Sequence, residues 1–90
     1  MPDIDPAALL PVQAVLRQLR DIKGVREARP GVFQLRGKPF LNFRLEGEVL
    51  QAELLKPGGV GFDRFAAAEP PQQRKLVEEA KLRAKRLDEE

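Results

Sequence analysis

Apolar residues recur near the amino terminus with the spacing of an amphipathic helix. Steps of three and four residues place them on one face, while charged and amide side chains fill the positions between. Gly24 follows soon after the last apolar residue of this pattern, and glycine is favoured immediately after a helix. The spacing therefore predicts a helix over residues 7–23. Its apolar face is expected to hold Val12, Val15, Leu16, Leu19 and Ile22.

Short runs in which apolar and polar residues alternate come next. They cover residues 25–29, 32–36, 39–45 and 49–55, and turn residues rich in glycine separate them. Alternation of this kind is typical of strands with one buried face. The pattern predicts an antiparallel meander of three to four strands. Its buried face is expected to hold Phe33, Leu35, Leu41, Phe43, Leu45, Leu50, Ala52 and Leu54.

A second helix is predicted over residues 70–88, after a loop at residues 56–69. The apolar face of this helix is rich in alanine, and its exposed side carries Lys75, Glu79 and Arg83 at four-residue spacing. Phe62 and Phe65 are expected to pin the loop onto the core. Residues 1–90 therefore predict a single α+β domain, a two-layer sandwich with both helices on one face of the sheet.

The composition removes most catalytic chemistry. The chain contains no Ser, Thr, Tyr, Cys, His or Trp. It therefore lacks hydroxyl, thiol and imidazole nucleophiles, thiolate and imidazole metal ligands, and disulfides. Lys38, Glu53 and Asp63 remain as candidates, but catalysis would need a carboxylate pair with separated pKa values or a buried lysine. We predict no catalytic residue, no metal site and no cofactor.

Charge and hydropathy limit the partners. Sixteen Lys and Arg against fourteen Asp and Glu leave a net charge of +2, and no segment forms a basic tail. This balance gives weak support for nucleic-acid binding. No apolar run reaches the length of about 18 residues that spans a membrane, and no signal peptide is evident, so a cytoplasmic location is expected.

Ten Arg, eight Pro and no Cys resemble the usage of heat-adapted proteins, which predicts a high melting temperature.

The polar face of the predicted sheet is the leading candidate for binding. It combines guanidinium groups, amides and one exposed aromatic ring, a mixture that suits contact with a second copy or another protein. We predict a non-enzymatic protein-interaction or homodimerising domain. One alternative is a nucleic-acid interface in which Phe40 stacks on a base while Arg36 and Arg44 hold phosphates. A second is a small-molecule site or an enzyme that uses Asp, Glu or Lys, and a third is an ordinary solvated face. The candidate residues are Gln34, Arg36, Phe40, Asn42, Arg44 and Gln51.

A glycine-rich loop is the second candidate. Glycines permit close approach of the backbone to a phosphate, and a helix follows. The loop has no GK[ST] sequence and no complete G-x-G-x-x-G motif, and residues 62–69 separate the glycines from the helix. A flexible connection is therefore the favoured interpretation. The candidate residues of this loop are Gly58, Gly59, Gly61, Asp63 and Arg64.

Two motifs carry a resemblance to known proteins. Gly37-Lys38-Pro39-Phe40-Leu41-Asn42-Phe43-Arg44 and Phe62-Asp63-Arg64-Phe65 resemble segments of small prokaryotic α+β proteins of unknown function. That resemblance implies a helix, a short meander and a final helix. Those proteins have His where Asn42 and Arg44 stand here, which implies that this chain lacks whatever the imidazoles do. A fainter resemblance links the chain to the YjbR group, whose members share a Gly-Lys-x-Phe strand and have been suspected of DNA binding.

Overall fold

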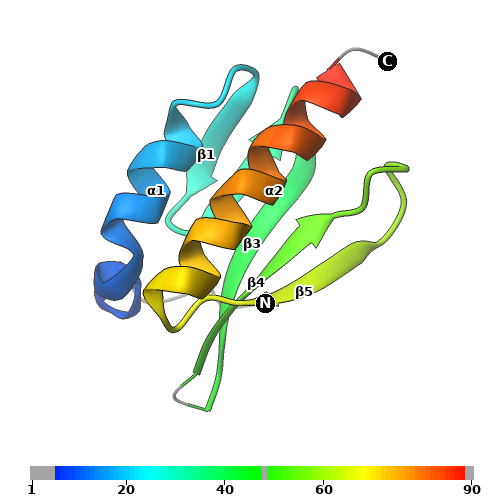
Figure 1. Cartoon of the computed structure of the whole chain (residues 1–90). Coiled ribbons are helices and arrows are strands. Elements are labelled where there is room, and N and C mark those ends of the chain that lie inside the picture. Colours follow the sequence, from blue (N-terminus) through cyan, green and yellow to red (C-terminus); the bar gives the residue numbers. More distant parts are fainter. Residues whose placement is uncertain (1–5, 48, 89–90) are drawn as a thin grey trace.

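The computed structural model describes residues 6–47 and 49–88. In chain order the elements are the 3-10 helix η1 (Pro6–Val12), the helix α1 (Gln13–Arg20), the strands β1 (Val25–Arg29), β2 (Val32–Leu35), β3 (Lys38–Glu46), β4 (Val49–Leu55) and β5 (Phe62–Ala66), and the helix α2 (Pro70–Asp88). Figure 1 shows α1 and α2 side by side, with the sheet behind them.

The amino-terminal helical segment differs from the single helix predicted over residues 7–23. It begins as the 3-10 helix η1, which contains Pro11, and becomes α-helical only at Gln13. Proline has no N–H to donate and its ring crowds the preceding turn, so a regular α-helix cannot continue through Pro11. At the other end α1 stops at Arg20, and the backbone reaches Gly24 at a φ of +84°, a value that glycine adopts readily.

The sheet has five antiparallel strands in the order β1-β2-β3-β4-β5, which corrects the prediction of three to four. Residues 25–29 form a strand, and the additional strand β5 lies in the segment predicted to be a loop. The sequence does not indicate this strand, because Phe62 and Phe65 are three residues apart and therefore show no alternation of apolar and polar positions. The glycines that precede them also favour a loop. The register Gln51↔Ala66 through Leu55↔Phe62 pairs β5 with β4 without interruption.

A bulge between β2 and β3 changes the position of Phe40. Phe33 pairs with Leu41 and Gln34 pairs with Pro39, so Phe40 is the extra residue between them. A bulge of this kind interrupts the alternation of faces along its strand. Phe40 is 0% exposed and belongs to the core. Its predicted place as an exposed ring on the polar face is therefore wrong.

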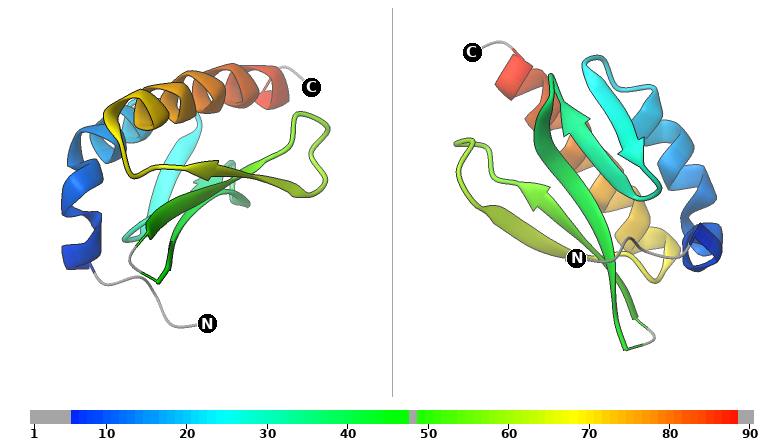
Figure 2. Two further views of the ribbon diagram at one scale, coloured as in Figure 1. Left: turned by 60° about the horizontal axis from the view of Figure 1, so that its bottom comes forward. Right: turned by 180° about the vertical axis from the view of Figure 1, so that it is seen from behind.

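The core lies between the sheet and the helices. Figure 2 shows both helices on the same side of the sheet, which leaves its other face without a covering helix. Leu16 and Leu19 of α1, Leu76 of α2, and Phe33 and Leu54 of the sheet belong to one cluster of buried apolar side chains. The β3–β4 hairpin extends past the ends of the helices (Figure 2). Leu45 near its tip is consequently 43% exposed, although alternation assigns it to the buried face.

Candidate functional site

The strand pairing brings most of the predicted binding residues onto one face. Arg44 of β3 pairs with Gln51 of β4, and Asn42 pairs with Glu53. Directly paired residues of antiparallel strands point to the same side of a sheet, so these side chains are neighbours. Gln34 of β2 lies on the same side, because its neighbour Phe33 points into the core. We call this surface, made by Gln34, Asn42, Arg44, Gln51, Glu53 and Arg64, the open face.

Ion pairs neutralise the arginines of the open face. The Nη1 atom of Arg44 lies 3.2 Å from Oε1 of Glu53, and Nη1 of Arg64 lies 3.3 Å from Oε1 of Glu46. A phosphate would have to compete with these carboxylates for the guanidinium groups. The nucleic-acid alternative requires an exposed stacking ring and two arginines that contact phosphates. The burial of Phe40 removes the ring, and the ion pair with Glu53 occupies Arg44, one of the two arginines.

One amide on the open face is incompletely satisfied. The Oε1 atom of Gln51 is buried and has no hydrogen-bond partner among the residues that the structure describes. Leaving a buried acceptor unpaired costs about 1–3 kcal/mol. Asn42, two positions along β3 from Arg44, the partner of Gln51, is a half-buried amide that can donate and accept. The open face therefore contains, at Gln51, a hydrogen-bond acceptor that no group in the described part of the chain uses.

Phe62 takes the role that Phe40 was expected to have. It pairs with Leu55 across β4 and β5, on the same side as the neighbouring pair Glu53↔Arg64, and is 40% exposed. Phe65 faces the other side and packs against the core. The expectation that both rings pin a loop onto the core is therefore wrong for Phe62. Strand alternation from Phe62 to Phe65 would have found it, had β5 been recognised as a strand.

Arg36 lies outside the open face, in the turn that joins β2 and β3. Its φ is +52° and that of Gly37 is +84°, a combination that suits a tight two-residue hairpin turn. Beside this turn is a cleft of about 350 Å³. It is lined by Leu35, Arg36, Lys38, Leu55, Gly58, Gly59 and Leu87.

This cleft joins one predicted open-face residue with part of the predicted glycine loop. It lies at the carboxyl end of α2, since Leu87 is in its wall. The carboxyl end of a helix carries partial negative charge, which opposes a bound phosphate. The other loop candidates lie elsewhere: Arg64 is on the open face, and Asp63 faces α2. The residues Gly58, Gly59, Gly61, Asp63 and Arg64 therefore do not form one site.

A network around Arg83 joins α2 to the edge of the sheet. Its Nη1 atom lies 3.0 Å from Oδ2 of Asp63 and donates a hydrogen bond of 3.3 Å to the carbonyl oxygen of Leu55. Its Nη2 atom lies 3.2 Å from Oε1 of Glu79, and the guanidinium lies 5.4 Å from the ring centre of Phe65. The side chain is only 11% exposed. These contacts make Arg83 a structural anchor for β5.

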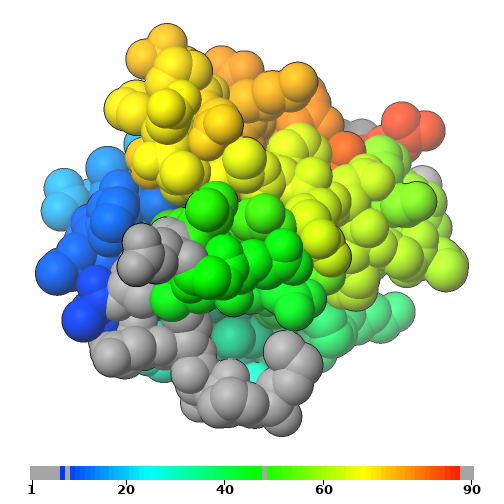
Figure 3. Space-filling view, turned by 90° about the horizontal axis from the view of Figure 1, so that it is seen from below, coloured from blue at the N-terminus to red at the C-terminus, as the bar shows by residue number. Residues whose placement is uncertain are grey.

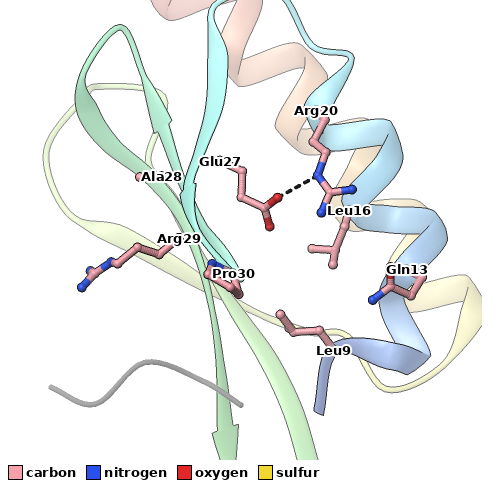
Figure 4. Close-up of a pocket in the computed structure, with 8 residues that line it drawn as sticks. All are labelled: Leu9, Gln13, Leu16, Arg20, Glu27, Ala28, Arg29 and Pro30. Carbon is pink, nitrogen blue, oxygen red and sulfur yellow. Dashed lines mark hydrogen bonds and ion pairs between the residues drawn. The ribbon is translucent and has the colours of Figure 1, made fainter. Parts of the chain in front are cut away.

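A second groove lies between α1 and β1 (Figure 4) and has a volume of about 350 Å³. Its polar feature is Glu27, whose Oε1 atom accepts a hydrogen bond of 2.7 Å from Nε of Arg20. The Oε2 atom of Glu27 accepts a hydrogen bond of 3.2 Å from the backbone N–H of Gly31. Both oxygens are thus engaged in holding β1 to α1 and to the β1–β2 turn. Leu9 and Leu16 supply the apolar wall.

The three candidate catalytic side chains are placed in different surroundings. Lys38 lines the cleft beside the β2–β3 turn, Glu53 is paired with Arg44 on the open face, and Asp63 belongs to the Arg83 network. Within residues 6–47 and 49–88, no group of three Asp or Glu side chains is arranged to hold a metal ion. None of the helices in this same part of the chain is long and apolar enough to cross a membrane.

Comparison with protein-family models, curated proteins and solved structures finds no match for this chain. The resemblance of its two phenylalanine-containing motifs to small prokaryotic proteins stays a prediction. Only the geometry of the chain itself therefore bears on its function.

Proposed function

We propose that the protein is a non-enzymatic interaction domain that forms a homodimer through its open face. Both helices cover the opposite side of the sheet, so the open face is the broad surface that the fold leaves to a partner. Its charges are largely paired within the chain, which lowers the cost of covering them.

The observation that carries the proposal is the buried Oε1 atom of Gln51, which has no hydrogen-bond partner within residues 6–47 and 49–88. A homodimer buries the same surface of both copies, so that surface must be complementary to itself. Amides meet this requirement because each one both donates and accepts hydrogen bonds. A small rotation of the Gln51 side chain would present its oxygen to a donor on a second copy.

The size of the molecule is sufficient for such an interface. Its two longer dimensions are 36 and 28 Å. A face of these dimensions has an area on the order of 1,000 Å², whereas a standard interface takes about 800 Å² from each partner. Val32, which is half-buried, and the more exposed Phe62 supply apolar area between and beside the polar side chains.

Sedimentation velocity at low and high micromolar concentration tests the proposal. The wild type should sediment as a species of at least twice the chain mass of 10.1 kDa. Gln51→Glu should halve the mass of the sedimenting species, because the contact through the open face would bury two added carboxylates without partners. Gln18→Glu is the matched control, since Gln18 is exposed on α1, on the opposite side of the molecule.

A second matched pair tests the apolar part of the face. Phe62→Ala should weaken the dimer, whereas Leu82→Ala, which removes an exposed side chain from α2, should leave it intact. A wild type that stays monomeric at every concentration would contradict the proposal. Equal effects of Gln51→Glu and Gln18→Glu would contradict the assignment to the open face.

A further inference from the structure

β5 is an edge strand whose outer backbone groups can be assigned from the hydrogen bonds at its two ends. The N–H of Ala67 donates to the carbonyl oxygen of Leu50 at 3.0 Å, and the N–H of Lys56 donates to the carbonyl oxygen of Gly61 at 2.9 Å. Hydrogen-bonded and non-bonded pairs alternate along an antiparallel ladder, so Phe65 and Asp63 are the residues of β5 that bond to β4. The N–H and C=O groups of the alternate residues therefore point away from the sheet.

These alternate residues are Phe62, Arg64 and Ala66. In the part of the chain that the structure describes, their outward N–H and C=O groups have no hydrogen-bond partner. Figure 1 shows β5 at the border of the sheet, beyond α2, so neither helix covers its outer edge. Seen from below (Figure 3), the yellow-green residues of this region form the right-hand flank of the molecule.

The two edges of the sheet differ in how they are protected. The pairing of β1 with β2 shifts register between Glu27 and Arg29, and Pro30 follows directly. Bulges and prolines are devices that prevent an edge from pairing with another strand. β5 has neither, because its register with β4 is continuous from Phe62 to Ala66. Of the two edges, β5 is therefore the one suited to accept a further strand.

We propose that β5 pairs antiparallel with β5 of a second copy about a two-fold axis at Arg64. This register places Arg64 opposite the partner's Arg64 and Phe62 opposite the partner's Ala66. It uses all three outward-facing residues of each copy, and each hydrogen-bonded pair exchanges two backbone hydrogen bonds. Shifting the strands by one residue pair in either direction leaves one of these residues without a partner.

Side-chain size and charge favour this register. Phe62, at 40% exposure, faces an exposed alanine, so a large side chain meets a small one on both sides of the axis. Like charges placed directly opposite one another are destabilising. Each Arg64 is paired with Glu46 of its own chain at 3.3 Å, which offsets the repulsion at the axis. A register centred on Asp63 would instead place two carboxylates opposite each other.

The edge contact goes beyond the contact through the open face and does not depend on it. Its two-fold axis is perpendicular to the sheet, whereas the axis that joins two open faces is parallel to it. Edge pairing would create one continuous sheet with the two open faces side by side. The contacts can therefore coexist, and each can fail while the other holds.

Disulfide formation tests the register without background, because the chain contains no Cys. Opposite residues of a hydrogen-bonded antiparallel pair have Cα atoms about 5.5 Å apart, within the range of about 4.4–6.8 Å that a disulfide spans. Arg64→Cys should form a disulfide dimer under mild oxidation, seen on a non-reducing gel and reversed by reductant. Phe62→Cys should form it about tenfold more slowly by itself, because the two Cys would lie far apart.

Mixed samples complete the test. Phe62→Cys mixed with Ala66→Cys should form a disulfide dimer faster than either variant does alone. Gln18→Cys, on the exposed side of α1 and away from the open face, measures random collision. The proposal is overturned if Arg64→Cys reacts no faster than Gln18→Cys. It is also overturned if Phe62→Cys alone reacts as fast as Arg64→Cys.

A backbone variant gives a second measurement. Arg64→Pro removes an outward N–H without removing a hydrogen bond to β4, whereas Arg64→Ala keeps that N–H. Proline should lower the sedimenting mass more than alanine, and equal effects would count against edge pairing. The disulfide of Arg64→Cys should also form in the Gln51→Glu background. Loss of the face contact and loss of the edge contact are thus separate results.

Discussion

Replacing Arg83 tests whether its network holds α2 against β5. Arg83→Met keeps an apolar stem of similar length and removes the guanidinium. Arg83→Ala removes the stem as well. Because the side chain is 11% exposed, the two variants separate the polar contribution from the packing contribution.

The polar contribution can be summed from the contacts. The hydrogen bond to the carbonyl oxygen of Leu55 contributes about 1 kcal/mol. Asp63 is 39% exposed, so its ion pair contributes about 0.5–1 kcal/mol. The helical pair with Glu79 and the contact with the Phe65 ring add about 1 kcal/mol together. Against this, Arg83→Met removes the buried Nε atom, which lacks a hydrogen-bond partner within the described residues, and this removal stabilises the fold by about 1 kcal/mol. Arg83→Met should therefore destabilise the protein by about 1–2 kcal/mol.

Removing the stem increases the loss. Burial of each methylene stabilises a fold by about 0.8 kcal/mol, so Arg83→Ala should cost about 3–4 kcal/mol in all. Urea unfolding followed by circular dichroism measures both variants. With a slope of about 1 kcal/mol per M for a chain of this size, the midpoint should fall by about 1–2 M for methionine and about 3–4 M for alanine.

Arg86→Met is the matched control for this experiment. Arg86 is exposed on α2 and makes no hydrogen bond or ion pair within the described part of the chain. Its replacement should change the free energy of unfolding by less than about 0.5 kcal/mol. The reasoning is refuted if Arg83→Met unfolds at the same urea concentration as the wild type. It is equally refuted if Arg86→Met is as destabilising as Arg83→Met.

Three further predictions concern stability. Phe40→Ala should destabilise the protein by about 3–5 kcal/mol in urea unfolding, because its ring is 0% exposed, whereas an exposed ring would cost less than about 1 kcal/mol. Gly37→Ala should lower the free energy of unfolding by about 1–2 kcal/mol, because alanine adopts a φ of +84° only with strain, although a Cβ there would meet no other atom. Gly58→Ala should be neutral or slightly stabilising in the same assay, because its Cβ would also meet open space and its φ is not positive. Calorimetry should give a melting temperature above the mesophilic range of about 45–65 °C, and cooperative unfolding at or below about 55 °C would contradict this.

The sequence predicts the parts of this fold that depend on local periodicity. The apolar spacing of residues 70–88 matches the range of α2. Alternation correctly places Asn42, Arg44 and Gln51 on one face, because β3 and β4 pair without a register shift from Leu41 to Glu46. Regular pairing preserves the alternation that a single strand displays. Where pairing is regular, the pattern of one strand is sufficient to assign the face of a residue.

Features that depend on two segments together could not be predicted. The bulge that buries Phe40 is set by the pairing of β3 with β2, and nothing in β3 alone reveals the extra residue. β5 becomes a strand because β4 provides a ladder for it, although its own pattern and the preceding glycines favour a loop. Both errors concern phenylalanines, which exchange roles: Phe40 is buried in the core and Phe62 is exposed on the open face.

The position of Arg83 explains why Phe62 is exposed on the open face, beside the edge of β5 that we propose as a second contact. Helical periodicity places it beside Glu79 on the polar side of α2, and only the fold shows that this side faces Asp63 on β5. Asp63 points toward the helices, so its strand neighbours Phe62 and Arg64 point to the open face. Holding Asp63 with Arg83 therefore fixes which face of β5 carries Phe62. This salt bridge therefore orients the strand on which the open face and the outer edge of β5 meet.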